Sequence, residues 1–96
     1  MNKELSSKIQ LLIDSILELS SQEETIQFLD DLCTVQELEQ LEQRLQAAKM
    51  LIDGATYEEV IAKTSISSAT LSRVSKCVHQ GNGYKTIINK LNNKIK

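Results

Sequence analysis

The stretch that decides the fold is TYEEVIAKTSISSATLSRV, residues 56–74. It contains two amphipathic helical segments on either side of a short turn at residues 65–67, the second continuing to about residue 79. The segments and the turn carry apolar side chains that can form one small core, namely Val60, Ile61, Ile66, Leu71 and Val74. A core of this kind holds two helices at a steep angle, so the stretch predicts a helix-turn-helix.

One position in the turn departs from the ideal. A helix-turn-helix commonly needs a left-handed backbone at the place of Ser65, where glycine fits at the least cost. Serine in that conformation costs about 1 kcal/mol. The sequence therefore predicts a positive φ at Ser65 and a slightly weaker motif.

The second helix of the motif would present a polar outer face. Its first turn, Ser67 to Thr70, has short side chains and hydroxyls, which let a helix lie close to base edges in the major groove. Arg73 and Lys76 follow and can neutralise phosphates, while free amides at the helix start favour an anion. We therefore predict DNA binding by these residues: Lys63, Ser67, Ser68, Ala69, Thr70, Ser72, Arg73 and Lys76.

Charge is divided unevenly along the chain. Residues 1–59 hold all 13 acids and four of the bases, whereas residues 60–96 hold seven bases and no acid. The basic part contains the outer face just described, which fits a surface that meets a polyanion. A solvated basic tail on an acidic domain would give the same pattern, so charge alone leaves both interpretations open.

The remainder of the chain also predicts helices, and no strand pattern or repeat appears. Apolar residues at helical spacing between Leu5 and Leu17 indicate one first helix. Three pairs match the capping box, in which two side chains satisfy amides at a helix start: Ser21 with Glu24, Thr34 with Glu37, and Thr56 with Glu59. Gly54 should end the long third helix in a left-handed turn.

Altogether the pattern predicts an all-α chain of about six helices. The fourth and fifth helices form the helix-turn-helix, and the sixth is amphipathic. The residues expected to face inward on these helices are Tyr57, Val60, Ile61, Leu71, Val74, Val78, Tyr84, Ile87, Ile88, Leu91 and Ile95.

Length and composition narrow the class of protein. A chain of 96 residues buries only a thin core, and oligomerisation is a common remedy. No apolar run of about 18 residues spans a membrane, and no secretory signal is apparent, so we expect a cytoplasmic protein. Cys33 and Cys77 lie far apart in the sequence and form no CxxC motif, so they indicate neither a disulfide scaffold nor a zinc site. No cofactor or metal is expected.

An enzyme is not expected either. His79 is the only histidine, and its place after the predicted recognition helix suits a phosphate contact or a helix-end residue. Adjacent acids do not face each other on a helix, so the pairs at residues 23–24, 30–31 and 58–59 make poor acid–base partners. No Gly-rich phosphate loop appears.

Several runs of residues together resemble the Trp repressor superfamily. They are TVQELEQLEQRLQAAKMLIDG at residues 34–54 and SATLSR at residues 68–73. The YerC/YecD branch of that superfamily shares patterns like FLDDLCT at 28–34, QRL at 43–45, AKML at 48–51 and GNG at 81–83. The resemblance covers residues 23–83, most of the chain.

The resemblance implies an intertwined homodimer, in which the first three helices and the last interlock between chains. The two helix-turn-helix units then project as reading heads, which implies a palindromic operator with half-sites about one helical turn apart. We expect a single domain over residues 1–96, with dimerisation helices in 1–53, the helix-turn-helix in 56–80 and a C-terminal helix in 84–96.

The resemblance also raises the question of an effector. The Trp repressor holds tryptophan between two arginines, and Arg44 and Arg73 stand at the matching positions, so the candidate effector pocket is Arg44, Arg73, Val74 and Cys77. Arg44 could instead pair with a neighbouring acid, and Arg73 with DNA. Val74 replaces a glycine beside the indole, Cys77 replaces a serine that helps hold the amino group, and Ala48 replaces a valine. Tryptophan is therefore disfavoured, and the sequence leaves open whether another small molecule binds.

The sequence thus predicts a sequence-specific double-stranded DNA-binding transcriptional regulator of the repressor type, acting as a homodimer. The competing interpretation is an all-helical protein-interaction or dimerisation module without DNA binding, which the acidic pI of about 5.4 favours. Salt dependence separates the two, because DNA affinity falls with a log–log slope of about −0.9 for each neutralised phosphate.

Overall fold

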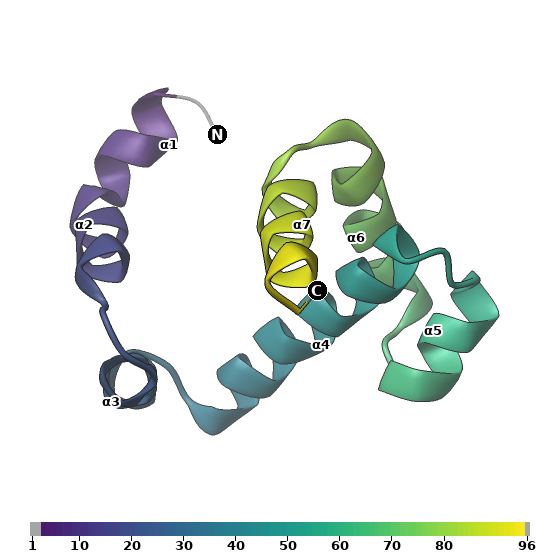
Figure 1. Ribbon diagram of the computed structural model, residues 1–96, viewed down its shortest axis with the longest axis horizontal. Coiled ribbons are helices and arrows are strands. Elements are labelled where there is room, and N and C mark those ends of the chain that lie inside the picture. The colour runs from purple at the N-terminus through teal and green to yellow at the C-terminus, as the bar shows by residue number, and fades with distance from the viewer. Residues whose placement is uncertain (1–2, 96) are drawn as a thin grey trace. The chain divides into compact units, whose positions relative to one another are not determined.

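The computed structural model describes residues 3–95, with Ile95 described by its backbone alone. Its helices are α1 (Lys3–Lys8), α2 (Gln10–Glu18), α3 (Gln22–Leu32), α4 (Val35–Ile52), α5 (Tyr57–Thr64), α6 (Ser68–Gln80) and α7 (Gly83–Ile95) (Figure 1). No strand occurs within residues 3–95, so the predicted all-helical class is confirmed. The side chain of Ile95, expected to face inward, lies outside the described residues.

The first expected helix is divided in two at Ile9. This residue has φ −114° and ψ 24°, outside the helical range, and no side chain caps the start of α2. Hydrogen bonds from Ile9 N to Leu5 O (3.2 Å) and from Ile13 N to Ile9 O (3.0 Å) continue across the break. Neither glycine nor proline marks this position, so apolar spacing predicted one helix where the structure has two.

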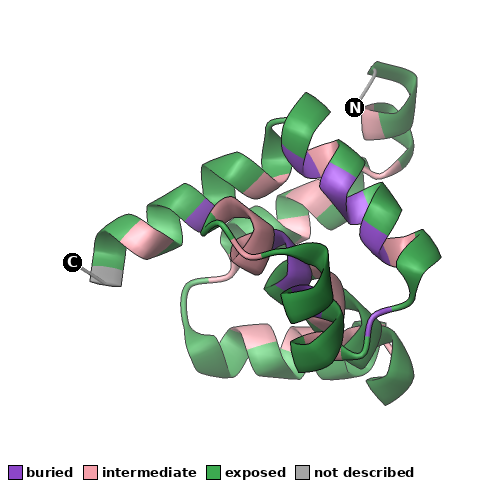
Figure 2. Cartoon of the chain, turned by 90° about the vertical axis from the view of Figure 1, so that its right-hand side faces the viewer, coloured by how far each residue is buried: buried purple, intermediate pink, exposed green. Residues whose placement is uncertain are grey.

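The chain divides into two compact units, residues 1–35 and residues 36–96. The second unit contains a buried core, whose positions on α4 and α6 are visible in Figure 2. The core residues are Ala47, Ala48, Val60, Ile66, Leu71, Val74 and Val78. Met50, Leu51, Ile52, Ala55 and Tyr84 pack against this cluster, and Ile88 of α7 is also buried. The core therefore involves both helices of the predicted motif.

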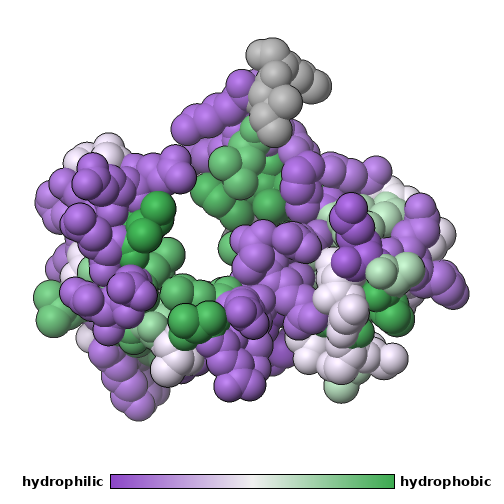
Figure 3. All heavy atoms as spheres, turned by 90° about the horizontal axis from the view of Figure 1, so that it is seen from below, coloured by the Kyte–Doolittle hydropathy of each residue, from purple (hydrophilic) through white to green (hydrophobic). Residues whose placement is uncertain are grey.

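The first unit, described by itself, has no such core. None of the described residues of α1, α2 and α3 is buried. Leu11 and Leu17 are 81% and 77% exposed, and the space-filling view shows hydrophobic residues at the surface of the chain (Figure 3). The unit thus consists of amphipathic helices whose apolar side chains remain largely uncovered. The expected single domain over residues 1–96 stays a prediction.

The end of α4 follows the glycine-capped pattern expected from the sequence. Gly54 has φ +102°, a left-handed conformation in which glycine carries no side-chain penalty. Ala55 N bonds Met50 O at 2.9 Å and Gly54 N bonds Leu51 O at 3.1 Å. These two bonds satisfy carbonyls at the helix end, as in a Schellman motif. The prediction for Gly54 is confirmed.

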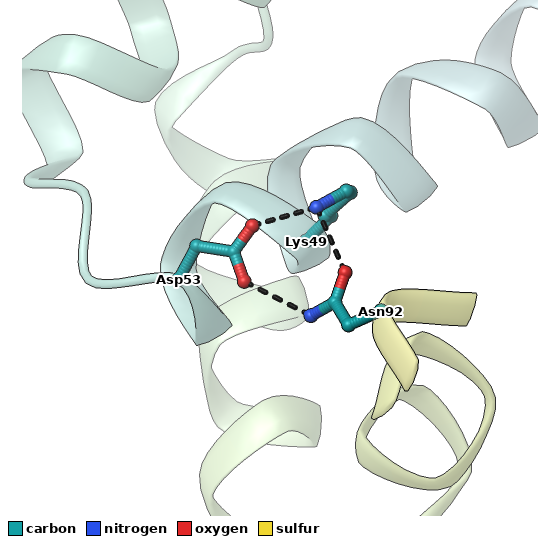
Figure 4. Close-up of polar contacts among 3 residues, drawn as sticks. All are labelled: Lys49, Asp53 and Asn92. Carbon is teal, nitrogen blue, oxygen red and sulfur yellow. Dashed lines mark hydrogen bonds and ion pairs between the residues drawn. The ribbon is translucent and has the colours of Figure 1, made fainter. Parts of the chain in front are cut away.

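A polar cluster joins the end of α4 to α7. Lys49 Nζ lies 2.7 Å from Asp53 Oδ2 and 3.0 Å from Asn92 Oδ1, and Asn92 Nδ2 donates to Asp53 Oδ1 at 3.2 Å (Figure 4). The hydrogen bond from Lys49 is the largest cause that lowers the pKa of Asp53, with its charge and the bond from Asn92 adding to it. These bonds link the end of α4 to α7, whose Ile88, one helical turn before Asn92, is buried.

Two of the predicted helix caps can be compared with the structure. Thr56 and Glu59 form a full capping box, in which Thr56 N donates to Glu59 Oε1 (2.9 Å) and Glu59 N to Thr56 Oγ1 (3.2 Å). At α3, Glu24 N donates to Ser21 Oγ at 3.1 Å, but the Glu24 carboxylate accepts from Ser20 N and Oγ instead of from Ser21 N. The box at Thr34 and Glu37 stays a prediction.

The inward faces predicted for α5 and α7 are partly wrong. Val60 is fully buried, whereas Tyr57 and Ile61 remain 43% and 39% exposed. Adjacent residues of a helix point about 100° apart, and the core beneath this eight-residue helix is narrow enough to bury Val60 alone. On α7, Ile87 and Leu91 are similarly about half exposed.

Candidate nucleic-acid interface

The turn between α5 and α6 has the geometry predicted for a helix-turn-helix. Ser65 adopts φ 59° and ψ 21°, the left-handed conformation expected there. Ser65 N bonds Ile61 O at 2.9 Å, and the Thr64 hydroxyl donates to Val60 O at 2.8 Å. Ile66 follows as a buried apolar residue, 2% exposed, beneath the turn. Four of the five predicted core residues are therefore buried, with Ile61 as the exception.

The two faces of α6 differ sharply in chemistry. Its inner face buries Leu71, Val74, Ser75 and Val78. Thr70 is half-buried, and the other predicted DNA-binding residues of the turn and α6 are exposed: Ser67, Ser68, Ala69, Ser72, Arg73 and Lys76. Lys63 is exposed in the last turn of α5. The predicted set therefore lies on α5, the turn and α6.

The bases of this face have no acidic partners within the described residues. The ion pairs Lys8–Glu4 and Lys49–Asp53 involve none of these bases, and no acid stands in the first turn of α6. Lys63, Arg73 and Lys76 are exposed. Their charges are thus available to phosphates, which is the requirement for anchoring a helix on a duplex.

The start of α6 carries a cap that the sequence analysis missed. Ser67 Oγ accepts from Thr70 N at 3.2 Å and donates to Thr70 Oγ1 at 2.9 Å. The Ser67 hydroxyl is therefore engaged within the first turn of α6. Ser67 itself could have predicted this cap, because serine is favoured at the position just before a helix begins.

The candidate effector residues are only partly brought together. A surface hollow of about 340 Å³ is lined by Arg73, Lys76, Cys77, Gln80 and Gly81. Arg73 and Cys77 of the predicted set border it. Val74 instead lies in the core at 2% exposure, and Arg44, half-buried on α4, is not among the lining residues.

Gly81, at the edge of this hollow, closes α6. Its amide donates to Cys77 O at 2.9 Å. A Cβ added to Gly81 would lie 2.9 Å from the same carbonyl oxygen, which real side chains do not tolerate. The end of α6 therefore needs glycine at position 81 for space, whereas a Cβ added at Gly83 would meet no neighbouring atom.

The described part of the chain contains neither a metal-binding cluster nor a membrane-spanning helix. Residues 3–95 contain no group of three or more His, Cys, Asp or Glu side chains that could hold a metal ion. None of the described helices is both long and apolar enough to cross a membrane. His79, the residue considered for acid–base chemistry, is exposed near the end of α6.

Comparison of the sequence with known protein families identifies the family of this chain. The sequence pattern of the Trp repressor protein family matches residues 7–92. The chain belongs to the Trp repressor family. It is 43% identical over 82 residues to YerC of Bacillus subtilis (strain 168), an uncharacterized protein, covering 85% of this chain and 79% of YerC.

Solved structures agree with this assignment. The fold is similar to that of a candidate Trp repressor from Staphylococcus aureus, with a TM-score of 0.84, 42% identity, and coverage of 90% of this chain and 87% of that one. It is also similar to a TrpR-like protein from Eubacterium eligens ATCC 27750, with a TM-score of 0.87, 35% identity, and coverage of 95% and 96%. The resemblance stated from the sequence is confirmed. The family is one of helix-turn-helix DNA-binding regulators and not of enzymes.

Proposed function

We propose that this Trp repressor family protein is a sequence-specific double-stranded DNA-binding transcriptional regulator of the repressor type. The observation that carries the proposal is the outer face of α6, where Arg73 and Lys76 stand exposed and free of acidic partners behind a hydroxyl-rich first turn. In this proposal Ser68, Ala69 and Thr70 approach base edges, and the two bases hold phosphates.

The active form in this proposal is a homodimer on a palindromic operator. Support comes from residues 3–35, where amphipathic helices bury none of their described residues. Leucines at 81% and 77% exposure on α2 would be covered by a second copy of the chain, which removes apolar surface from water at about 25 cal/mol per Å². A two-fold dimer would present two α6 helices to two half-sites.

Tryptophan is not the effector in this proposal. Val74 is packed in the core with Leu71 and Val60, and its branched side chain stands where the Trp repressor has a glycine beside the indole. Cys77 and Arg73 border the surface hollow on α6, and an effector of another chemistry remains compatible with the proposal. We assign none.

Selection of bound duplexes from a random DNA pool tests the proposal most directly. The expected result is a palindromic consensus with half-sites about one helical turn apart. Affinity for that consensus should fall steeply with salt, with a log–log slope of about −0.9 per phosphate contacted. A pool that stays random through repeated rounds would reject sequence-specific DNA binding.

The second candidate function is a protein-interaction module that does not bind DNA. Tyr57 and Ile61 favour it, because they form an exposed apolar pair one helical turn apart on α5. The acidic pI of about 5.4 also favours it. This candidate predicts little or no duplex affinity at any salt concentration, so the same titration decides between the two functions.

A further inference from the structure

A long-range hydrogen bond ties the helix-turn-helix turn to α4. Gln43 Nε2 donates to Thr64 O at 2.9 Å, between residues 21 positions apart and in a part-buried setting. Thr64 is the last residue of α5, where helix carbonyls lack partners within their own helix. The Gln43 amide supplies a partner for one of them.

The bond falls beside the strained residue of the turn. Ser65, the next residue, is the non-glycine residue with positive φ among those described. The Thr64 hydroxyl donates to Val60 O at 2.8 Å and accepts from Ile66 N at 3.3 Å. Thr64 therefore holds the end of α5, the buried Ile66 and, through Gln43, helix α4. A left-handed serine persists only where its surroundings fix it.

Gln43 is well placed for this task on α4. It lies four residues before Ala47, so the two side chains share one face of the helix. Ala47 is fully buried in the core, whereas Gln43 is half-buried at the rim of that core. Gln40, on the same side of α4 and three residues earlier, is exposed. It provides a matched control.

We propose that Gln43 is a positioning residue for the reading head: through Thr64 it fixes the turn on α4, and with it the direction in which α6 is presented to DNA. The inference rests on the proposed function and assigns a role in specificity to a residue outside the helix-turn-helix. Without the bond, each head also occupies orientations that do not match base edges, so apparent operator affinity falls with the competent fraction. Affinity for random DNA depends on charge and changes little.

The test compares Gln43→Leu and Gln43→Glu with the control Gln40→Leu. Both Gln43 variants lose the donor; the glutamate keeps the shape of the side chain but adds a negative charge, so its losses are compared with those of Gln40→Glu. Affinity is measured for the selected operator and for random duplex of the same length at one salt concentration, with thermal unfolding and dimer state as folding checks. The expected result is a loss of about tenfold on the operator for both Gln43 variants, the scale of one hydrogen bond. Gln40→Leu should match the wild type.

A rescue variant separates positioning from a general loss of stability. Glycine adopts the left-handed conformation without a side-chain penalty, so Ser65→Gly added to Gln43→Leu should recover part of the operator affinity. Amide hydrogen exchange at Ser65 and Ile66 should be faster in Gln43→Leu and slower again in the double variant. These readouts follow the turn itself.

The outcomes are distinct. Operator affinity that is unchanged in both Gln43 variants overturns the positioning role and leaves the proposed function intact. Equal losses on operator and random DNA overturn it as well, because specificity would then not depend on the bond. A wild-type protein that does not distinguish operator from random duplex overturns the proposed function and this inference together.

Discussion

The two units of the chain treat the same kind of sequence differently. Both are amphipathic helices with abundant Leu and Ile, yet residues 36–96 bury Val60 and Leu71 completely while residues 3–35 bury nothing. Periodic apolar residues therefore predict helices in both units but predict a core in only one. In the second unit the apolar faces meet each other, whereas in the first they remain largely exposed.

Truncating one leucine in each unit should give the largest and clearest contrast. Leu71→Ala removes a fully buried side chain and should lower the free energy of unfolding by about 3 kcal/mol, as cavities of this size do. Leu17→Ala removes a side chain that is 77% exposed. In dilute protein it should change stability by less than about 0.5 kcal/mol.

Urea unfolding at two protein concentrations measures both effects. If a second copy covers α2, the cost of Leu17→Ala should grow as concentration rises, because dimerisation contributes to stability by mass action. The cost of Leu71→Ala should be large at both concentrations. If both substitutions lowered the free energy of unfolding equally at both concentrations, the first unit would have a core of its own. The two units would then not differ in burial.

Removing the two exposed bases of α6 should separate DNA binding from dimerisation. Arg73→Ala with Lys76→Ala should weaken duplex binding by at least about 100-fold and reduce the salt slope by about 0.9 for each phosphate that is no longer neutralised. The dimer should persist, because both side chains are exposed on α6. Lys90→Ala with Lys94→Ala removes the same charge from α7 and should cost less.

Gel shifts and analytical ultracentrifugation measure the two properties independently. Wild-type affinity in the α6 variant would remove Arg73 and Lys76 from the interface. Loss of the dimer in the same variant would instead show that α6 also contributes to dimerisation. Dimerisation would then not depend on the first unit alone.

Local features of the helix-turn-helix were predictable from the sequence. The left-handed Ser65, the capping box at Thr56 and the glycine end at Gly54 were all expected, and all are present. Each depends on residues within about one helical turn of each other, where spacing and residue type constrain the backbone directly. The family resemblance followed from other runs of sequence, chiefly residues 34–54 and 68–73.

Features that depend on distant residues were not predictable. The bond from Gln43 to Thr64 joins positions 21 apart, and the bond from Asn92 to Asp53 joins positions 39 apart. Such pairs leave no periodic trace in a single sequence. The exposure of Ile61 has a related cause, because its neighbour Val60 fills the place on the core, and the pattern alone could not choose between them.

Acid should weaken the second unit through two carboxylates with lowered pKa values. The backbone hydrogen bond from Thr56 is the largest cause at Glu59, and the hydrogen bond from Lys49 is the largest at Asp53. A folded-state pKa below the unfolded value stabilises the fold above that unfolded value, and this stabilisation is lost as pH falls. The loss should therefore occur below the ordinary values of 4.5 for Glu59 and 3.8 for Asp53.

Thermal unfolding from pH 6 to pH 3 measures this effect in suitable variants. Asp53→Asn should flatten the acid limb of the curve, since the group that titrates is gone. Asp30→Asn in α3 makes the same charge change in the first unit and serves as the control. If the melting temperature of Asp53→Asn changed with pH in the same way as that of the wild type, the Lys49–Asp53–Asn92 cluster would not contribute to the acid dependence of stability.

Tryptophan should produce the smallest effect of all, no change in melting temperature or operator affinity. Val74 is 2% exposed within the core of the second unit, and its branched side chain stands where the Trp repressor has a glycine beside the indole, so we expect no room for an indole there. A ligand at 100 times its Kd would stabilise the fold by about 2.7 kcal/mol, which calorimetry resolves easily. Stabilisation that grows with tryptophan concentration would therefore overturn the expectation that this chain does not bind tryptophan. The structure of the second unit would then depend on whether a ligand is bound. Its buried core would distinguish it from the first unit only in the ligand-free protein.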